Sequence, residues 1–202
     1  MKQPTAHPQI LPRSFYDRSP EIVARALLGK VLTHRYRGQL LTGRILEVEA
    51  YLGLSDPASH AFIGRTNFNA VLFGPPGIAY TYFVYGMHYC LNVSCLPDGE
   101  PDGEPGGILF RALLPLEGIA TMARLRGLPA TAKPQQLTGG PGRLCEALGI
   151  AGETRSGVDV TLPGSRIQIL DDGHHPHAIE VTPRIGLSKA ADRPLRFVVT
   201  KL

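Results

Sequence analysis

The chain has 202 residues, 43% of them hydrophobic, which is enough for one domain with a sizeable core. It has no apolar stretch long enough to span a bilayer and no signal-peptide core, so we expect a soluble intracellular protein of the cytoplasm, nucleoid or nucleus, not a membrane protein. The net charge of +4 is compatible with a polyanionic partner.

Residues 1–13 contain three prolines, and we expect them to form a flexible N-terminal segment ahead of a single domain, residues 14–202. The first predicted element of the domain is a helix. Ser19 supplies a capping hydroxyl, Pro20 takes the first helical position, and Gly29 ends the helix.

Most later elements are predicted strands. Residues 31–36 and 39–49 form a hairpin that turns at Arg37 and Gly38. Further strands are predicted within 80–95 and at 108–113, 158–162, 166–170 and 196–200, and helices at 117–126 and 142–148. Because short strands dominate a mixed order, we predict an α+β fold around a mainly antiparallel, curved sheet with flanking helices.

Two acids of the second predicted strand are candidates for chemistry. The two-residue period of a strand places Glu47 and Glu49 on one face, with Leu46 and Val48 opposite. Such a pattern is typical of the exposed polar face of a half-buried sheet. Apolar neighbours follow Glu49, however, and a carboxylate in poorly hydrated surroundings can act as a general base.

The segment 77–92 is rich in tyrosine. Four of the chain's seven tyrosines lie there, namely Tyr80, Tyr82, Tyr85 and Tyr89. In a strand the first two face one side and the last two the other, so they cannot all belong to one core layer. Aromatic residues are favoured in strands for packing alone. Flat rings that end in an amide, Asn92, also suit a pocket that stacks on a nucleobase and checks its edge.

Two further candidates lie in the loop-rich segment before the tyrosines. His60 has the chemistry of a ligand contact, although a lone histidine is more often structural. Arg65 follows a glycine that lets the backbone approach a ligand closely, so a phosphate contact competes with an ordinary surface arginine.

The sequence predicts no metal and no other cofactor. The cysteines are odd in number and form no Cys-x-x-Cys pair, so we expect reduced thiols at Cys90, Cys95 and Cys145. Loop composition favours a solvated turn over a metal site at His174, His175 and His177. A solvated, mobile loop is also expected at 97–107, where four acids lie within seven residues, Asp98, Glu100, Asp102 and Glu104.

Ordered motifs run along most of the chain. They are Ala-Arg-Ala-Leu-Leu-Gly at 24–29, Glu-Ala-Tyr-Leu-Gly at 49–53, Asp56 with His60, Gly-Arg-Thr at 64–66, Tyr-Gly-Met-His-Tyr at 85–89, Arg-Ala-Leu-Leu-Pro-Leu-Glu-Gly at 111–118, Gly-Pro-Gly-Arg-Leu-Cys at 140–145, Pro-Arg-Ile-Gly at 183–186 and Pro-Leu-Arg-Phe at 194–197. Together they resemble the motifs of the alkyladenine (3-methyladenine, or methylpurine) DNA glycosylase family. At 67–68 the chain has Asn-Phe where many relatives have proline and a basic residue.

The resemblance implies a monofunctional glycosylase of base excision repair. Such an enzyme flips an alkylated or deaminated purine out of double-stranded DNA and hydrolyses the N-glycosidic bond, without a cofactor and, we expect, as a monomer. The family's fold resembles the C-terminal domain of methionyl-tRNA formyltransferase, and the acidic loop is expected to point away from DNA. A non-catalytic nucleic-acid binding module of the same fold is the alternative, but a pure binder needs no enclosed carboxylate such as Glu49.

The resemblance also implies roles for individual residues. Glu49 matches the general base for the attacking water, which Arg111 and the backbone carbonyl of Ile185 help to hold. The other implied roles are base stacking by Tyr51 and Tyr82, an edge contact by His60, exclusion of some purines by Asn92, filling of the vacated stack by Tyr85, and a phosphate contact by Arg65.

Overall fold

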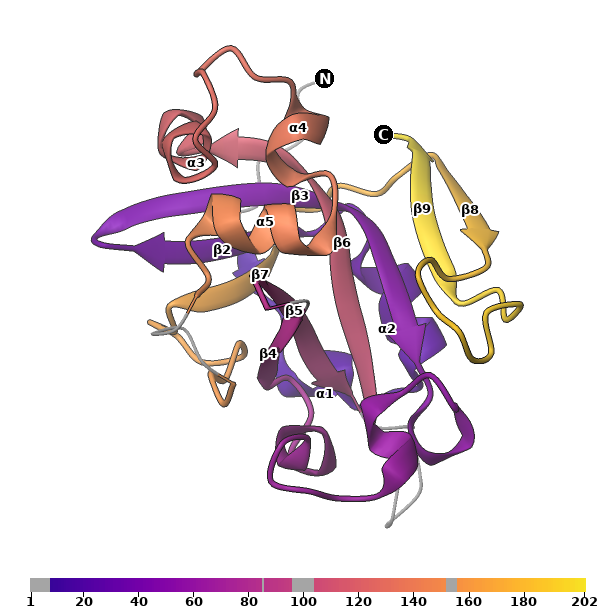
Figure 1. Ribbon diagram of the computed structural model, residues 1–202. Helices are drawn as coiled ribbons and strands as arrows, with labels where there is room; N and C mark the ends of the chain where they lie inside the picture. The colour runs from indigo at the N-terminus through magenta and orange to yellow at the C-terminus, as the bar shows by residue number, and fades with distance from the viewer. Residues whose placement is uncertain (1–7, 85, 96–103, 152–155) are drawn as a thin grey trace.

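The structure is a computed structural model that describes residues 8–84, 86–95, 104–151 and 156–202 (Figure 1). Its strands are β1 (Gln9–Ile10), β2 (Val31–Tyr36), β3 (Gln39–Tyr51), β4 (Ala79–Val84), β5 (His88–Cys95), β6 (Gly106–Glu117), β7 (Ile167–Asp171), β8 (Ala178–Thr182) and β9 (Arg196–Lys201). Its helices are α1 (Arg13–Tyr16), α2 (Pro20–Leu27), α3 (Ile119–Leu125), α4 (Pro134–Thr138) and α5 (Pro141–Leu148), with short 3-10 helices η1 (Gly53–Ser55), η2 (His60–Ile63) and η3 (Ala70–Phe73).

The described strands form one curled antiparallel sheet in the order β1-β7-β2-β3-β6-β5-β4. The long strand β3 organises it. One edge of β3 pairs with β6, while the other edge pairs first with β2 and then, from Glu47 to Glu49, with β9 of the β8–β9 hairpin. The prediction of an α+β fold around an antiparallel, curved sheet is therefore confirmed.

Two helices hold the central strands in place. Helix α2 packs against β3 and β6, and α5 packs against β5 and β6. Buried side chains from these elements form one hydrophobic cluster, which includes Leu27, Leu144, Val48 and Phe110. Burial of such a cluster is the main favourable contribution to folding. It fixes β3 and β6, the strands that carry Glu49 and Arg111.

The first helix and the first hairpin lie where the sequence predicts them. Both turn residues of the hairpin have positive φ, 47° at Arg37 and 84° at Gly38, which matches the twist of the flanking strands. Ser19 occupies the N-cap of α2, but its side chain makes no capping hydrogen bond, so that detail of the prediction is wrong.

Residues 158–162 do not form the predicted strand. Asp159 makes one isolated bridge with Ile78. Its side chain accepts hydrogen bonds from the backbone N–H and the hydroxyl of Thr161, at 3.0 and 2.6 Å. A side chain that bonds its own neighbours in this way favours a turn over a strand.

The bounds of two other predicted segments, the helix at 117–126 and the loop at 97–107, differ in the structure. Helix α3 starts at Ile119, because β6 runs on to Glu117 and Gly118 follows with a φ of 78°. Residues 96–103, which include most of the expected acidic loop, lie outside the described residues. Gly106 and Gly107, at the end of that expected loop, belong to β6. The side chain of Glu104 accepts a hydrogen bond of 2.8 Å from the hydroxyl of Ser55.

The N-terminal segment is described from residue 8. Strand β1 pairs with β7, and Leu11 is buried. The domain boundary expected at residue 13 stays a prediction. Among the described residues, no helix is both long and apolar enough to cross a membrane.

Candidate active site

Irregular pairing between β3 and β6 brings Arg111 to the two acids of β3. Glu47 pairs with Ala112 and Val48 with Phe110, so Arg111 is left without a partner in the register. Such a bulge increases the local twist and redirects side chains. Arg111 donates from Nε to Oε1 of Glu47 at 2.7 Å, and its Nη1 lies 3.2 Å from Oε1 of Glu49.

Glu49 is fully buried, so the exposed-face interpretation is wrong for this residue. Its Oε2 accepts a hydrogen bond of 3.0 Å from the Tyr51 hydroxyl. Its Oε1 accepts one of 2.8 Å from the backbone N–H of Ile185 and also faces Arg111. A carboxylate offers about four acceptor sites, so these three donors leave room for one more, such as a water molecule.

Glu47 is held more tightly by charge than Glu49. Its Oε1 accepts hydrogen bonds from Arg111 and from Nε of Arg196, both at 2.7 Å. Burial raises the pKa of Glu47, but the two arginines outweigh burial and hold this pKa below its usual range. Glu47 is thus suited to orient Arg111, not to take up a proton.

Arg111 keeps its positive charge between the two acids. Burial alone lowers the pKa of a guanidinium, but the Glu49 and Glu47 carboxylates raise the pKa of Arg111 above its ordinary value. The cation and the two hydrogen-bond donors together fix the position of the Glu49 carboxylate.

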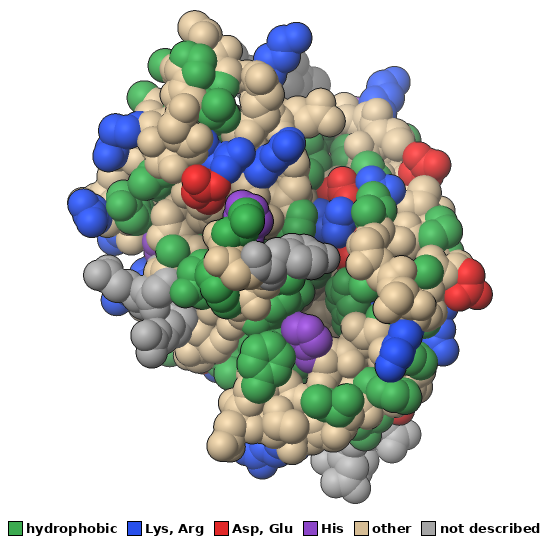
Figure 2. Space-filling view, viewed as in Figure 1, with side chains coloured by type: hydrophobic (Ala, Val, Ile, Leu, Met, Phe, Trp, Pro, Cys, Tyr) green, Lys and Arg blue, Asp and Glu red, His purple; other side chains and the backbone are tan. Residues whose placement is uncertain are grey.

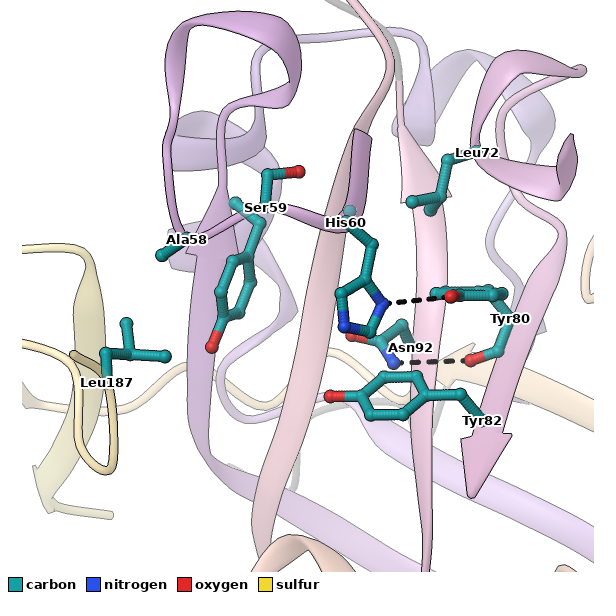
Figure 3. A pocket seen from close by; sticks show the side chains of 10 residues that line it. Ala58, Ser59, His60, Leu72, Tyr80, Tyr82, Asn92 and Leu187 are labelled. Atoms are coloured by element: carbon teal, nitrogen blue, oxygen red, sulfur yellow. Dashed lines mark hydrogen bonds between the residues drawn. The ribbon is translucent and has the colours of Figure 1, made fainter. Parts of the chain in front are cut away.

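Tyr51, whose hydroxyl donates to Glu49, lines a cavity that Figure 3 shows from close by. Four predicted site residues line it: Tyr51, His60, Tyr82 and Asn92. Tyr51 and Asn92, the first and last of them, are 41 positions apart in the sequence. The four residues come from four different elements, β3, η2, β4 and β5. In the space-filling view, hydrophobic side chains surround a hollow at the centre of this face, and Lys and Arg side chains gather mostly in the upper half (Figure 2).

Tyr80 orients two of the lining side chains. Its hydroxyl lies 2.9 Å from Nδ1 of His60, and its backbone carbonyl accepts a hydrogen bond of 3.3 Å from Nδ2 of Asn92 (Figure 3). Burial lowers the pKa of His60, which favours the neutral imidazole. Burial raises the pKa of Tyr80, so its hydroxyl keeps its proton.

Tyr51 is fixed by a buried ion pair that the sequence did not predict. The guanidinium carbon of Arg184 lies 4.6 Å from the centre of the Tyr51 ring. Arg184 donates to both carboxylate oxygens of Asp56, at 2.5 and 2.8 Å, and neither side chain is exposed. Both residues lie in recognisable motifs, but their separation of 128 residues leaves no local signal for the pairing.

The remaining predicted residues are placed less fully. Arg65 is exposed in the loop between η2 and η3, and Tyr85 lies outside the described residues. The backbone N–H of Ile185 contacts Glu49, so the expected contact of its carbonyl with water stays a prediction. The three cysteines are buried free thiols. No group of three or more possible metal ligands occurs in the described part of the chain.

A buried carboxylate beside a cavity lined with aromatic rings, on a curled antiparallel sheet, defines a site that can enclose a planar ligand next to a proton acceptor. The chain belongs to the methylpurine-DNA glycosylase (MPG) family, whose family model matches residues 14–202. It is therefore a member of a family of DNA glycosylases.

Curated relatives match over nearly the whole chain. A protein of Koribacter versatilis (strain Ellin345) is 53% identical over 192 residues, which cover 94% of this chain and 89% of the relative. A protein of Burkholderia lata is 44% identical over 191 residues, 94% of this chain and 87% of the relative. One of Methanocella arvoryzae is 42% identical over 191 residues, 93% and 91%. Each is named "Putative 3-methyladenine DNA glycosylase".

Proposed function

We propose that the protein is a monofunctional DNA glycosylase that flips alkylated or deaminated purines out of duplex DNA and hydrolyses their N-glycosidic bond. The observation that carries the proposal is the buried carboxylate of Glu49, which borders an aromatic cavity through its hydrogen bond with Tyr51. Family membership supports the same class of reaction.

The cavity supplies the interactions that a flipped purine needs. Extrusion costs a few kcal/mol of stacking and pairing, and each aromatic stack returns about 1 to 3 kcal/mol. Tyr51 and Tyr82 are the stacking rings in this proposal. An alkylated purine carries positive charge, which strengthens its attraction to electron-rich rings. His60 and Asn92 read the edge of the base.

Glu49 acts as the general base. The oxygen of a water molecule attacks the anomeric carbon of the sugar, the bonding electrons leave with the purine, and Glu49 takes a proton from the water. A positioned base contributes about 10² to 10⁴ in rate. Arg111 and Tyr51 hold the carboxylate in place, and the carbonyl of Ile185 is a further partner for the water.

Water, not an amine, is the nucleophile in this mechanism. None of the described residues that line the cavity is a lysine, so no amine is placed to form a Schiff base with the sugar. The alternative is a non-catalytic nucleic-acid binding module. Such a module would not need a buried carboxylate that three donors hold in place.

Contacts to DNA complete the proposal. Arg65, which is exposed, binds a phosphate, and Tyr85 fills the gap that the flipped base leaves. The partner is double-stranded DNA with a damaged purine, and the protein acts as a monomer.

The test uses duplex oligonucleotides that carry one hypoxanthine or one methylated purine. Incubation with the purified protein should give strand breaks only after alkali treatment, and the undamaged duplex should stay intact. Borohydride should trap no covalent complex. Efficient trapping would show that the nucleophile is an amine, and the absence of breaks on every damaged duplex would contradict glycosylase activity.

A further inference from the structure

Four aromatic rings form a cluster beside the cavity, which we call the ring cluster: His60, Phe68, Tyr80 and Tyr82. Every ring contacts the other three, with centroid distances from 4.5 Å (His60 to Tyr82) to 6.4 Å (Phe68 to Tyr82). Three of the rings line the cavity, but Phe68 does not, and 56% of Phe68 is exposed. Phe68 therefore contacts rings that line the cavity without lining the cavity itself.

A hydrogen-bonded turn holds Phe68 in this position. The side chain of the next residue, Asn69, is fully buried. Its Nδ2 donates to the carbonyls of His60 and Gly64 at 2.7 and 2.8 Å, and its Oδ1 accepts from the backbone N–H of Thr66 at 2.7 Å. The turn is thus tied to the same helix η2 that carries His60. A single exposed phenylalanine on a protein surface needs no special explanation. Phe68 differs because a hydrogen-bonded turn holds its ring against three rings of the site.

We propose that Phe68 is a positioning residue of the base cavity, which holds the rings of His60 and Tyr82 in the arrangement that stacks on a flipped purine. This inference rests on the proposed function. The Phe68 ring lies 5.3 Å from His60 at an interplanar angle of 56°, and 6.4 Å from Tyr82 at 64°. Tilted and edge-on pairs of this kind are favourable and directional, so each ring limits the rotation of its neighbour.

The position of Phe68 also affects how far the cavity-lining rings are exposed to solvent. Because Phe68 contacts His60 and Tyr82 and is itself 56% exposed, removal of its ring would leave both rings less shielded from solvent. Burial lowers the pKa of His60, and Phe68 is one of the side chains that bury it. A cavity wall that stays ordered before DNA arrives loses less conformational freedom when a base binds.

The test compares three variants in single-turnover excision of hypoxanthine from duplex DNA. Phe68→Ala should slow excision about tenfold, equivalent to about 1.4 kcal/mol. Phe68→Tyr keeps the ring and should restore the wild-type rate. Phe62→Ala is the matched control, because Phe62 lies in η2, close in sequence to Phe68, is 44% exposed and is not part of the ring cluster. A wild-type rate for Phe68→Ala would overturn the inference.

Binding measurements separate a positioning role from a direct DNA contact. A duplex with a stable abasic-site analogue presents no base to the cavity, so Phe68→Ala should bind it as tightly as the wild type does. An equal loss of affinity for this DNA and for lesion DNA would show that Phe68 contacts the DNA itself, and would contradict the inference.

A measurement without DNA separates this inference from the proposed function. In ¹⁵N spectra of the free protein, the imidazole signals of His60, assigned from a His60→Gln variant, should shift or broaden in Phe68→Ala and stay unchanged in Phe62→Ala. Unchanged signals in Phe68→Ala would overturn the positioning role. A wild-type protein that excises no damaged base would instead contradict the proposed function, whatever the spectra show.

Discussion

The guanidinium carbon of Arg184 lies 4.6 Å from the centre of the Tyr51 ring, and the same guanidinium is paired with buried Asp56. A cation over the face of a tyrosine is attractive, and more so when both groups are shielded from water. Tyr51 also donates to Glu49. The ion pair, the stacking ring and the proposed base therefore form one connected unit.

The Asp56–Arg184 pair predicts a large loss of stability when one partner is removed. Asp56→Asn leaves the charge of buried Arg184 without its counter-ion, which costs about 3 to 5 kcal/mol in free energy of unfolding. Urea unfolding at neutral pH measures the change. Asp192→Asn is the control because Asp192 is exposed, and its stability should match that of the wild type.

The same pair predicts a pH dependence. Burial raises the pKa of Asp56, but hydrogen bonds from Arg184 and two backbone N–H groups outweigh it and hold this pKa below its ordinary value of 3.8. The pKa of this carboxyl is lower in the folded state than in the unfolded state, where it has its ordinary value of 3.8. Its contribution to stability is therefore complete at pH values above 3.8 and is lost as the pH falls through the folded-state pKa. Wild-type stability should therefore fall more steeply below that pH than the stability of Asp56→Asn.

Glu47 is predicted to act through Arg111. Glu47→Gln weakens the contacts that hold Arg111 and Arg196, so the guanidinium beside Glu49 becomes less well placed. Small displacements of catalytic groups can cost up to about 10²-fold in rate, and we expect a loss of about tenfold or more in single-turnover excision. Affinity for an abasic-site analogue should stay unchanged. An unaltered excision rate would leave Glu47 with a structural role only.

Tyr80 is predicted to set the hydrogen-bonding pattern of His60. Its buried hydroxyl lies 2.9 Å from Nδ1 of His60. We predict that the hydroxyl donates and Nδ1 accepts, which leaves the proton of the neutral imidazole on Nε2. Tyr80→Phe removes this bond but keeps the ring. We expect a loss of about 1 kcal/mol in stability and slower release of hypoxanthine. ¹⁵N chemical shifts of His60 that show a proton on Nδ1 in the wild type would contradict the assignment.

Asn92 is predicted to exclude guanine-type bases. Its Nδ2 donates to the carbonyl of Tyr80, which holds the amide at the cavity wall, where it can crowd an extra amino group. Rejection through crowding or an unpaired donor is a common source of selectivity. Asn92→Ser should raise excision of guanine-type bases relative to hypoxanthine. Single-turnover rates on matched duplexes measure the ratio, and an unchanged ratio would leave Asn92 as a structural residue of β5.

Local sequence patterns predicted much of the fold and part of the site. The turn at Arg37 and Gly38, the common face of Glu47 and Glu49, and the shared side of Tyr80 and Tyr82 all follow from strand periodicity and turn chemistry. These features depend on neighbours within a few residues, which a single sequence displays directly.

Features that depend on distant residues could not be predicted in the same way. The bulge that turns Arg111 toward Glu49 arises from the pairing of two strands, and the Asp56–Arg184 pair joins residues 128 positions apart. Strand β8 and helix α4 were not predicted, and β8 has the exposed pattern of an edge hairpin, which gives little hydrophobic signal. In the sequence, Phe68 is only a departure from the family's motif. Its contacts with three rings of the site form only in the folded chain.

The most direct test of the central claim is single-turnover excision by Glu49→Gln on a duplex with one hypoxanthine, measured beside binding to an abasic-site analogue. The amide keeps the size of the side chain but cannot accept the proton of the attacking water. We predict a loss of at least about 10²-fold in base release, with affinity for the analogue close to that of the wild type. Excision by Glu49→Gln at the wild-type rate would contradict the assignment of Glu49 as the general base.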